Sequence, residues 1–292
     1  SKRSESFKRV AAWYGRGQGS VFIQDANSLI MPTSDLAEAL ETMRRRIPGI
    51  TRITTYGRSN TVARKGLEEL KALHEAGLDR VHVGMESGSD QVLKLMRKGS
   101  TAEQHIQAGK AIVRAGMTLS EYVMPGLGGR DLSREHAMET AHVLNAINPH
   151  FIRIRSLHII PSTPLADMVE KGAFTPMGDE ETVREIRLLV ESLEGIQSTL
   201  TSDHIMNLLE EVSGTFPQDK EAMLETIDHY LTMPASDRLL FRLGRRAGGL
   251  RSPYDLSDPG IRSRLEQARM ELEQREGREL ESILSDMSLQ SL

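Results

Sequence analysis

The stretch Val81-His-Val-Gly-Met-Glu-Ser-Gly-Ser-Asp90 begins as a β-rich run and ends in polar residues and glycine. Similar β-rich runs occupy residues 21–25, 52–56, 80–84, 118–124 and 151–157. Segments with helical periodicity lie between them, at residues 34–47, 66–76, 102–115 and 133–147. Strands that alternate with helices at this spacing favour parallel βαβ units with right-handed crossovers.

After Gly172 the pattern changes to helices alone. Helical periodicity covers residues 180–193, 204–212, 220–231 and 261–284, with no β-rich run between them. We therefore expect an α/β fold with five visible strands, followed by an all-helical C-terminal region. The predicted domains are residues 1–172 and 173–292.

Composition restricts the classes of function. The chain has 292 residues, a formal net charge of −4 and no cysteine. The charge provides no basic field, so neither a nucleic acid nor a membrane surface is an expected partner. No apolar run is long enough to span a bilayer and no signal peptide opens the chain, so we expect a cytoplasmic protein. The lack of cysteine excludes disulfides and thiolate metal ligands within these residues.

Ligands of parallel βα folds bind where the strands end, because loops and helix N-termini converge there. The first predicted strand runs into Asp25, Asn27 and Ser28, whose polar side chains suit an amine or hydroxyl groups. A turn that caps the following helix is the alternative.

The third predicted strand ends in Glu86, Ser87 and Gly88. An acid, a hydroxyl group and a glycine that permits close backbone approach suit the recognition of a ribose or an amino acid. The alternative is a helix that Ser89 caps, with an acid nearby.

The fourth and fifth strands end in segments of different character. Gly126 begins a glycine-rich turn that lets backbone groups border a planar ring or an anion, although such turns often have no ligand. Side chains alternate between the two faces of a strand, so Arg153 and Arg155 lie on the same face of the fifth strand. If that face is buried they need an anionic ligand; the alternatives are that they face solvent or pair with Glu86. The dipeptide Asp203-His204 is predicted to cap a helix rather than to form a catalytic dyad.

Five segments together resemble the radical S-adenosylmethionine (SAM) superfamily, and the order of strands followed by a helical tail is similar to that of its iron–sulfur oxidoreductases. They are Phe22-Ile-Gln-Asp-Ala-Asn, Val83-Gly-Met-Glu-Ser-Gly-Ser-Asp-Gln-Val-Leu, Lys98-Gly-Ser-Thr, Tyr122-Val-Met-Pro-Gly-Leu-Gly-Gly and Ile159-Ile-Pro-Ser-Thr-Pro-Leu165. They follow the family's order over about half of the chain. The resemblance implies a partial parallel (β/α)6 TIM-like barrel of which the first strand is missing here.

The resemblance also implies a set of cofactor-binding residues. These are Asp25, Ala26, Asn27, Glu86, Ser87, Gly126, Leu127, Arg153, Arg155, Ile159 and Ile160. Asp25, Ala26 and Asn27 match the family's contacts to the methionine amine. Glu86 and Ser87 match its contacts to ribose or methionyl groups. The segments around Gly126 and Ile159 match those that border adenine, and either arginine would complement the carboxylate. No catalytic residue is assigned.

The family cleaves SAM reductively with a four-iron cluster to give a 5′-deoxyadenosyl radical, and three cysteines in a Cys-x3-Cys-x2-Cys loop hold that cluster. Those cysteines are absent from this chain. We expect the cluster segment to lie upstream of Ser1, which would make this most of a radical SAM oxidoreductase or transferase with an unidentified small-molecule substrate.

Two alternatives stay open. The first is a cluster-free barrel that serves as a ligand-binding or partner-binding module. The second is a lyase that holds an anionic substrate through Arg153 and Arg155. An exposed strand edge would in addition favour homodimers.

Overall fold

The computed structural model describes residues 5, 8, 11–12, 15, 19–24, 26–204 and 206–284. Within these residues lie seven strands: β1 (Ser20–Ile23), β2 (Arg52–Gly57), β3 (Arg80–Glu86), β4 (Thr118–Val123), β5 (Phe151–Ile154), β6 (Thr199–Thr201) and β7 (Gly214–Thr215). They follow one another in chain order in one sheet. The pairs β1–β2, β2–β3 and β5–β6 are parallel, and β7 pairs antiparallel with β6. This order is that of successive βα units, so the predicted α/β class is confirmed.

The chain divides into two compact units. The first unit consists of residues 1–84 and 103–121, and the second of residues 85–102 and 122–292. The division passes through β3 and β4 and therefore differs from the boundary expected at Gly172. That domain boundary stays a prediction.

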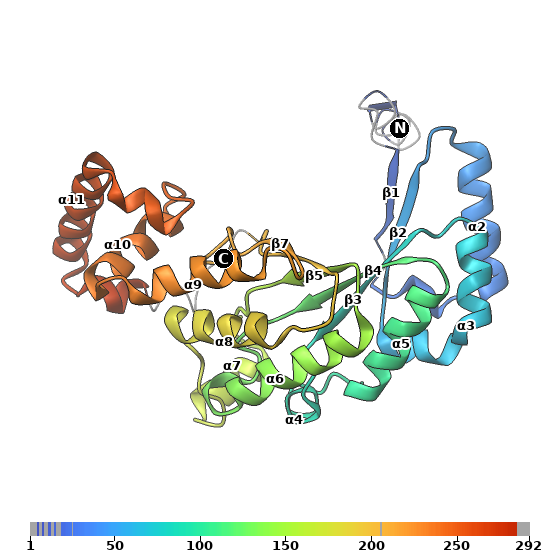
Figure 1. The fold of residues 1–292 in the computed structure, drawn as a ribbon, viewed down its shortest axis with the longest axis horizontal. Helices are drawn as coiled ribbons and strands as arrows, with labels where there is room; N and C mark the ends of the chain where they lie inside the picture. Colours follow the sequence, from blue (N-terminus) through green and yellow to red (C-terminus); the bar gives the residue numbers. More distant parts are fainter. Residues whose placement is uncertain are drawn as a thin grey trace. The chain divides into compact units, whose positions relative to one another are not determined.

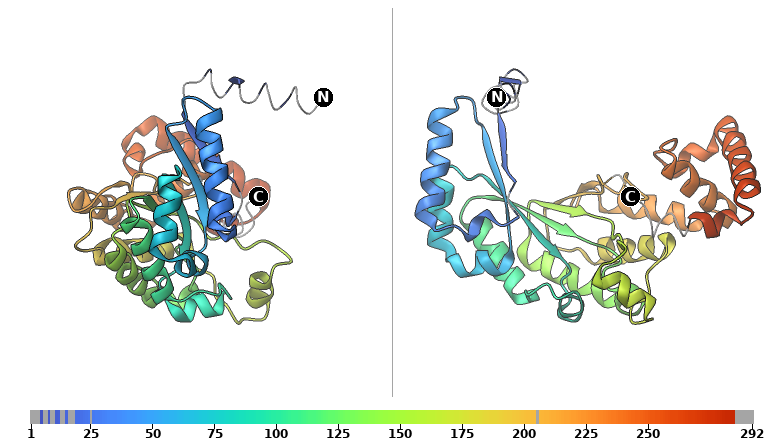
Figure 2. Two further views of the ribbon diagram at one scale, coloured as in Figure 1. Left: turned by 90° about the vertical axis from the view of Figure 1, so that its right-hand side faces the viewer. Right: turned by 180° about the vertical axis from the view of Figure 1, so that it is seen from behind.

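Helices with one apolar face build the first unit. They are α2 (Thr33–Arg46), α3 (Ser59–Glu75) and α5 (Ala102–Arg114), together with the short η1 (Ser28–Ile30). In α2 the buried residues are Leu36 and Leu40, and in α3 they include Leu70 and Leu73, at the three- and four-residue spacing of one helix face. Figures 1 and 2 show α2 and α3 side by side.

Three aromatic rings lie on neighbouring strands of the first unit. The ring of Phe22 in β1 lies 4.8 Å from that of Tyr56 in β2 and 5.5 Å from that of His82 in β3, measured between centroids. The register that aligns Tyr56 with His82 explains this grouping.

The first unit also buries a carboxyl group in β4. Glu121 is 0% exposed, and neither of its carboxyl oxygens has a hydrogen-bond partner in the described part of the chain. Burial raises the pKa of this carboxyl well above its ordinary value.

The second unit contains most of the helices. They are α4 (Asp90–Leu95), α6 (Gly129–Ile147), α7 (Pro164–Glu170), α8 (Asp179–Ser192), α9 (Lys220–Thr232), α10 (Ala235–Arg246), η2 (Pro253–Ser257) and α11 (Pro259–Glu276). Helices α6 and α8 pack side by side (Figure 1), and α6 buries Ala137, Ala141 and Leu144 along one face. No helix in the described ranges has the length and apolar character that a bilayer span requires.

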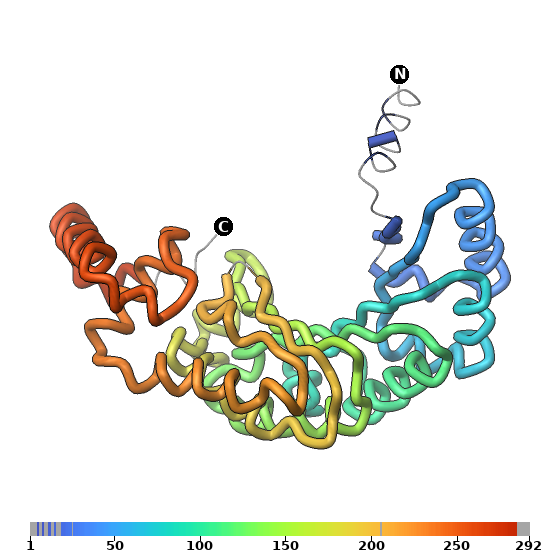
Figure 3. Tube along the Cα trace, turned by 45° about the horizontal axis from the view of Figure 1, so that its top comes forward, coloured from blue at the N-terminus to red at the C-terminus, as the bar shows by residue number. Residues whose placement is uncertain are grey.

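Ion pairs join α10 to the first turn of α8. Arg242 is 4% exposed, and its Nε lies 2.8 Å from a carboxylate oxygen of Asp179. Arg246 lies 2.8 Å from the same carboxylate, and Glu281 also pairs with Arg242. A buried guanidinium is costly unless it is paired, so these contacts hold α10 in place. Figure 3 shows α10 next to α11, which it contacts, in the red part of the trace.

The structure after Gly172 differs from the expected pattern of helices alone by two strands, and it differs from the predicted helices at one segment that is a loop and at one further helix. Strands β6 and β7 have three and two residues, too few to show a period in the sequence. The predicted helix at residues 204–212 is a loop in its described part, where Leu209 and Val212 are buried by tertiary contact rather than by helical packing. Helix α10 was not predicted.

Candidate cofactor-binding site

Three strand ends of the second unit are joined by backbone hydrogen bonds. The amide of Met124 donates to the carbonyl of Glu86 at 3.0 Å, which joins the ends of β3 and β4. The amide of Arg155 donates to the carbonyl of Val123 at 2.8 Å, which joins β5 to β4. The predicted site residues of these three strands therefore share one edge of the sheet, where ligands of such folds bind.

Glu86 has a left-handed backbone. Its φ is 63°, a conformation that costs about 1–3 kcal/mol for a residue with a Cβ and persists only where the surroundings enforce it. Its carbonyl accepts two hydrogen bonds, from the Met124 amide and from Nε2 of His136 at 3.1 Å. Its side chain is 23% exposed and forms an ion pair with Lys98.

Ser87 faces the protein interior. It is 0% exposed, and its hydroxyl oxygen accepts a hydrogen bond from the amide of Ser89 at 3.0 Å. Ser89 caps α4 by accepting from the amide of Val92 and donates to a carboxylate oxygen of Glu135 at 2.6 Å. The capping interpretation of this segment therefore applies to Ser89, and the Ser87 hydroxyl is engaged in the same turn.

A side chain of α8 accepts a hydrogen bond from the glycine-rich turn after β4. Gly126 has a φ of +87°, which favours glycine, and its amide donates to Oε1 of Glu185 at 2.7 Å. The amide of Leu127 donates to the carbonyl of Met124 at 3.2 Å and closes the turn, with the Leu127 side chain buried.

A buried histidine–carboxylate pair, not predicted from the sequence, lies beneath these strand ends. Nδ1 of His136 in α6 is 2.8 Å from Oε1 of Glu185 in α8, and the side chains are 1% and 2% exposed. The helical period could have revealed this pair, because it places both residues on buried helix faces. His136, Thr140 and Val143 share the buried face of α6, and Glu185 precedes the buried Leu189 by one turn. Polar residues on apolar helix faces need partners, which here are each other.

Arg153 and Arg155 share one partner, and it is not Glu86. Their guanidinium groups lie 2.6 Å and 2.9 Å from the two carboxylate oxygens of Asp203. Arg155 also lies 4.8 Å from the centroid of the Tyr122 ring. Asp203 is therefore an ion-pair residue, and the prediction that it caps a helix is wrong. Burial alone would raise the pKa of Asp203, but hydrogen bonds and charges from Arg155 and Arg153 outweigh it and lower that pKa.

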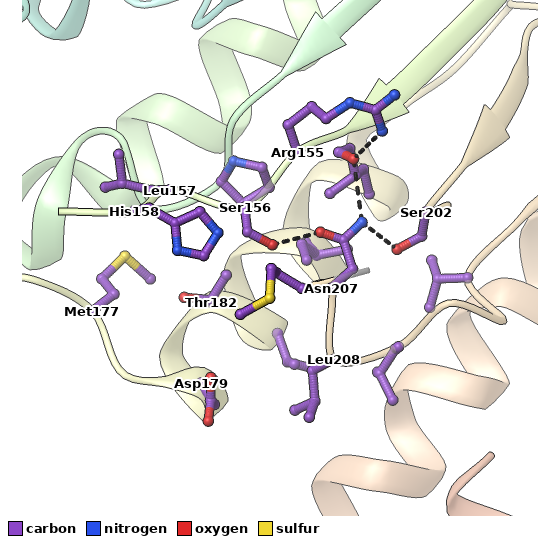
Figure 4. A pocket seen from close by; sticks show the side chains of 18 of the residues that line it. Arg155, Ser156, Leu157, His158, Met177, Asp179, Thr182, Ser202, Asn207 and Leu208 are labelled. Carbon is purple, nitrogen blue, oxygen red and sulfur yellow. Dashed lines mark hydrogen bonds between the residues drawn. The ribbon is translucent and has the colours of Figure 1, made fainter. Parts of the chain in front are cut away.

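A pocket lies at the ends of β4 and β5, against α8 and the loop after β6 (Figure 4). Gly126, Arg155 and Ile159, three of the predicted cofactor-binding residues, line it. Its cavity volume is about 100 Å³; because one water molecule needs about 10–15 Å³ of such space, there is room for a ring-sized group. The wall is mixed: apolar side chains such as Leu157 and Leu208 surround the amide of Asn207.

Among the described residues of this wall, His158 is the polar side chain without a hydrogen-bond partner. Neither of its ring nitrogens has a hydrogen-bond partner within the described residues, although its ring lies 6.2 Å from that of His204. Ser156 and Asn207, by contrast, are bonded to each other at 2.7 Å. Burial, and then the charge of Arg246, lower the pKa of His158, so the ring is neutral at pH 7 and offers one donor and one acceptor.

The remaining predicted residues lie elsewhere. Ile160 is 62% exposed and is not part of the pocket lining. Ala26 and Asn27 belong to the first unit, and Asp25 lies outside the described residues. The Asn27 side chain accepts from the amide of Arg58 at 3.1 Å and donates to Thr61 at 3.0 Å, so it anchors the start of α3. This use is structural, but it differs from the capping alternative, because the following helix α2 has Pro32 at its N-cap and no side-chain cap hydrogen bond.

The donor groups present fit a nucleoside but not an iron–sulfur cluster. The unbonded ring nitrogens of His158 and the backbone at Gly126 can border a heteroaromatic base. The chain has no cysteine, and no group of three histidine, aspartate or glutamate residues in the described ranges is arranged to hold a metal ion. Any cluster would need ligands from outside these 292 residues.

Comparisons with known proteins found a matching family and several partial relatives. The model of the radical SAM superfamily matches residues 3–141. A tRNA uridine(34) acetyltransferase of Methanocaldococcus infernus is 28% identical over 120 residues, which are 41% of this chain and 22% of that protein. A 4′-phospho-dehydrooxetanocin synthase of Priestia megaterium is 40% identical over 70 residues, 21% of this chain and 9% of that protein.

Among solved structures, that of the archaeal Methanocaldococcus infernus Elp3 with an N-terminal deletion has a TM-score of 0.49 and 19% identity, covering 63% of this chain and 48% of that one. The chain spans less than a quarter of the length of the two curated relatives named above. Over residues 3–141, this chain carries a domain of the radical SAM superfamily.

Proposed function

We propose that the chain provides the nucleoside-binding part of a radical SAM enzyme whose substrate is unknown. The observation that carries this proposal is the pocket in which Gly126, Arg155 and Ile159 meet. These residues follow two neighbouring strands, and each matches a cofactor contact of the family that the sequence resembles. Their meeting in one pocket with a neutral imidazole supports a base-binding role.

Each group has a defined task in this proposal. The backbone at Gly126 borders the base, and the Glu86 carboxylate accepts hydrogen bonds from ribose or methionyl groups. Arg155 receives the ligand carboxylate in exchange for part of its contact with Asp203, which is 50% exposed and can turn to solvent. When SAM is bound to a reduced cluster, the family's chemistry supplies the 5′-deoxyadenosyl radical. Oxidoreduction or group transfer on a small molecule is the proposed reaction class.

Partners and location are proposals as well. The net charge of −4 gives no reason to propose a nucleic-acid or membrane partner. We propose a cytoplasmic protein that forms homodimers through an exposed strand edge.

A second candidate function rests on the absence of cysteine. A barrel that binds a nucleoside-like ligand or a partner without radical chemistry needs no cluster ligands. The coding sequence upstream of Ser1 distinguishes the two candidates: three cysteines with the family spacing, and iron absorbance after anaerobic reconstitution of the longer protein, would support the enzyme.

Binding of SAM tests the nucleoside site. We expect the wild-type chain to bind SAM weakly in equilibrium dialysis, because the methionyl group of the family's cofactor normally rests on iron. His158→Ala should weaken binding about threefold to tenfold, the effect of one lost hydrogen bond. Glu86→Gln should weaken it in the same direction.

The matched control is His142→Ala, since His142 is exposed on α6. Its affinity should equal that of the wild type. Lack of SAM binding by the wild-type chain at millimolar concentration would remove the proposed site.

A further inference from the structure

We infer that the buried pair His136–Glu185 is a positioning unit, which sets the ends of β3 and β4 in the conformation that binds the adenosyl ligand. This inference rests on the proposed function. The pair bridges α6 and α8 and reaches one backbone group at each strand end. It thereby couples two segments of the site that are distant in sequence.

The contacts form a continuous chain. The carbonyl of Glu86 accepts from Nε2 of His136 at 3.1 Å, Nδ1 of His136 lies 2.8 Å from Oε1 of Glu185, and that oxygen accepts from the amide of Gly126 at 2.7 Å. Both ends of the chain have left-handed backbones, with φ of 63° at Glu86 and +87° at Gly126. At Glu86, which carries a Cβ, this conformation is strained and persists only where the surroundings over-determine it, as this chain of contacts does. Gly126 adopts it without that cost.

Burial shows that the pair acts through the backbone rather than on a ligand. The side chains of His136 and Glu185 are 1% and 2% exposed, and neither lines the pocket. A buried ionisable pair adds little stability compared with apolar residues of the same volume. Its contribution is therefore geometric: it specifies where Glu86 and Gly126 lie.

The protonation pattern suggests which substitution preserves the geometry. A backbone carbonyl can only accept, so Nε2 of His136 carries the hydrogen of its bond to Glu86. In Glu185→Gln, the amide oxygen can take the place of Oε1 and accept from the Gly126 amide, while Nε2–H still donates to the carbonyl of Glu86. In His136→Ala both bridging bonds are lost.

The experiment compares SAM affinity by equilibrium dialysis in the full chain. His136→Ala should weaken binding about tenfold or more, because displaced binding groups cost at least this much. Glu185→Gln should stay within about threefold of the wild type. The control His105→Ala removes another 1% exposed histidine, which is bonded to Ser59 in the first unit, and should leave affinity unchanged despite a comparable loss of stability.

Hydrogen exchange gives a readout without ligand. Peptides that contain the Gly126 amide should exchange faster in His136→Ala than in Glu185→Gln or His105→Ala. Equal affinity of wild type and His136→Ala would overturn the positioning role while the proposed function stands. A similar loss in His105→Ala would assign the effect to stability and overturn it as well. Wild-type protein that does not bind SAM would remove the proposed function, and the inference with it.

Discussion

Replacing Glu121 with methionine should stabilise the protein, most strongly at alkaline pH. The carboxyl is 0% exposed, neither oxygen has a hydrogen-bond partner in the described part of the chain, and burial raises its pKa well above the ordinary value. A buried polar group without a partner costs about 1–3 kcal/mol in protein mutational data. Methionine has a similar length and no such cost. We expect the free energy of unfolding at pH 8 to increase by about this amount.

The pH dependence has a defined sign. At acid pH, below the ordinary carboxyl pKa, Glu121 is protonated in both the folded and the unfolded state, and the group makes no pH-dependent contribution. As the pH rises through the ordinary value toward the raised pKa, only the unfolded state ionises readily, so stability falls. The gain from Glu121→Met should therefore be smaller at pH 4 than at pH 8, and Glu121→Gln should remove the same pH dependence.

Urea denaturation at the two pH values measures this effect. The control is Glu38→Met, because Glu38 is exposed on α2 and its replacement should change stability by no more than about 0.5 kcal/mol. A Glu121→Met protein that is less stable than the wild type at pH 8 would show that the carboxyl has a favourable interaction.

The strand–helix alternation was predictable because each element is long enough to show its period. The five predicted strands and the helices α2, α3, α5, α6, α8 and α9 are all present. Strands β6 and β7 escaped prediction because their pairing with β5 and with each other depends on tertiary contacts rather than on local pattern.

The candidate site was predictable at the level of segments but less so at the level of side chains. Sequence identifies the polar strand ends, and the resemblance identifies their residues. It does not show that Asp203 neutralises Arg153 and Arg155, because the partner is about 50 residues away along the chain. Such long-range pairing depends on the fold, and no periodic pattern in the local sequence indicates it.

Gly88 shows the limit of reasoning from a motif. Its position after Glu86 suggested close backbone approach to a ligand, and the structure shows close approach to α6 instead. A Cβ atom at residue 88 would lie 2.4 Å from the carbonyl oxygen of Glu139 and 2.6 Å from Cα of Thr140. The amide of Gly88 also donates to the hydroxyl of Thr140 at 2.9 Å, so this loop is packed directly on the helix backbone.

Gly88→Ala should therefore destabilise the protein by about 3 kcal/mol, at the upper end of the usual cost of overpacking. The methyl group meets helix backbone, which cannot rotate away as a side chain can, so either α6 or the end of β3 must move. Because Glu86 lies two residues earlier, SAM affinity should fall together with stability. Gly249→Ala is the matched control: Gly249 is exposed, and its added Cβ would meet only the carbonyl oxygen of Gly244, at 3.6 Å. Urea denaturation should show that variant at or slightly above wild-type stability, and equal stability of both variants would mean that the loop and α6 are further apart than the structure places them.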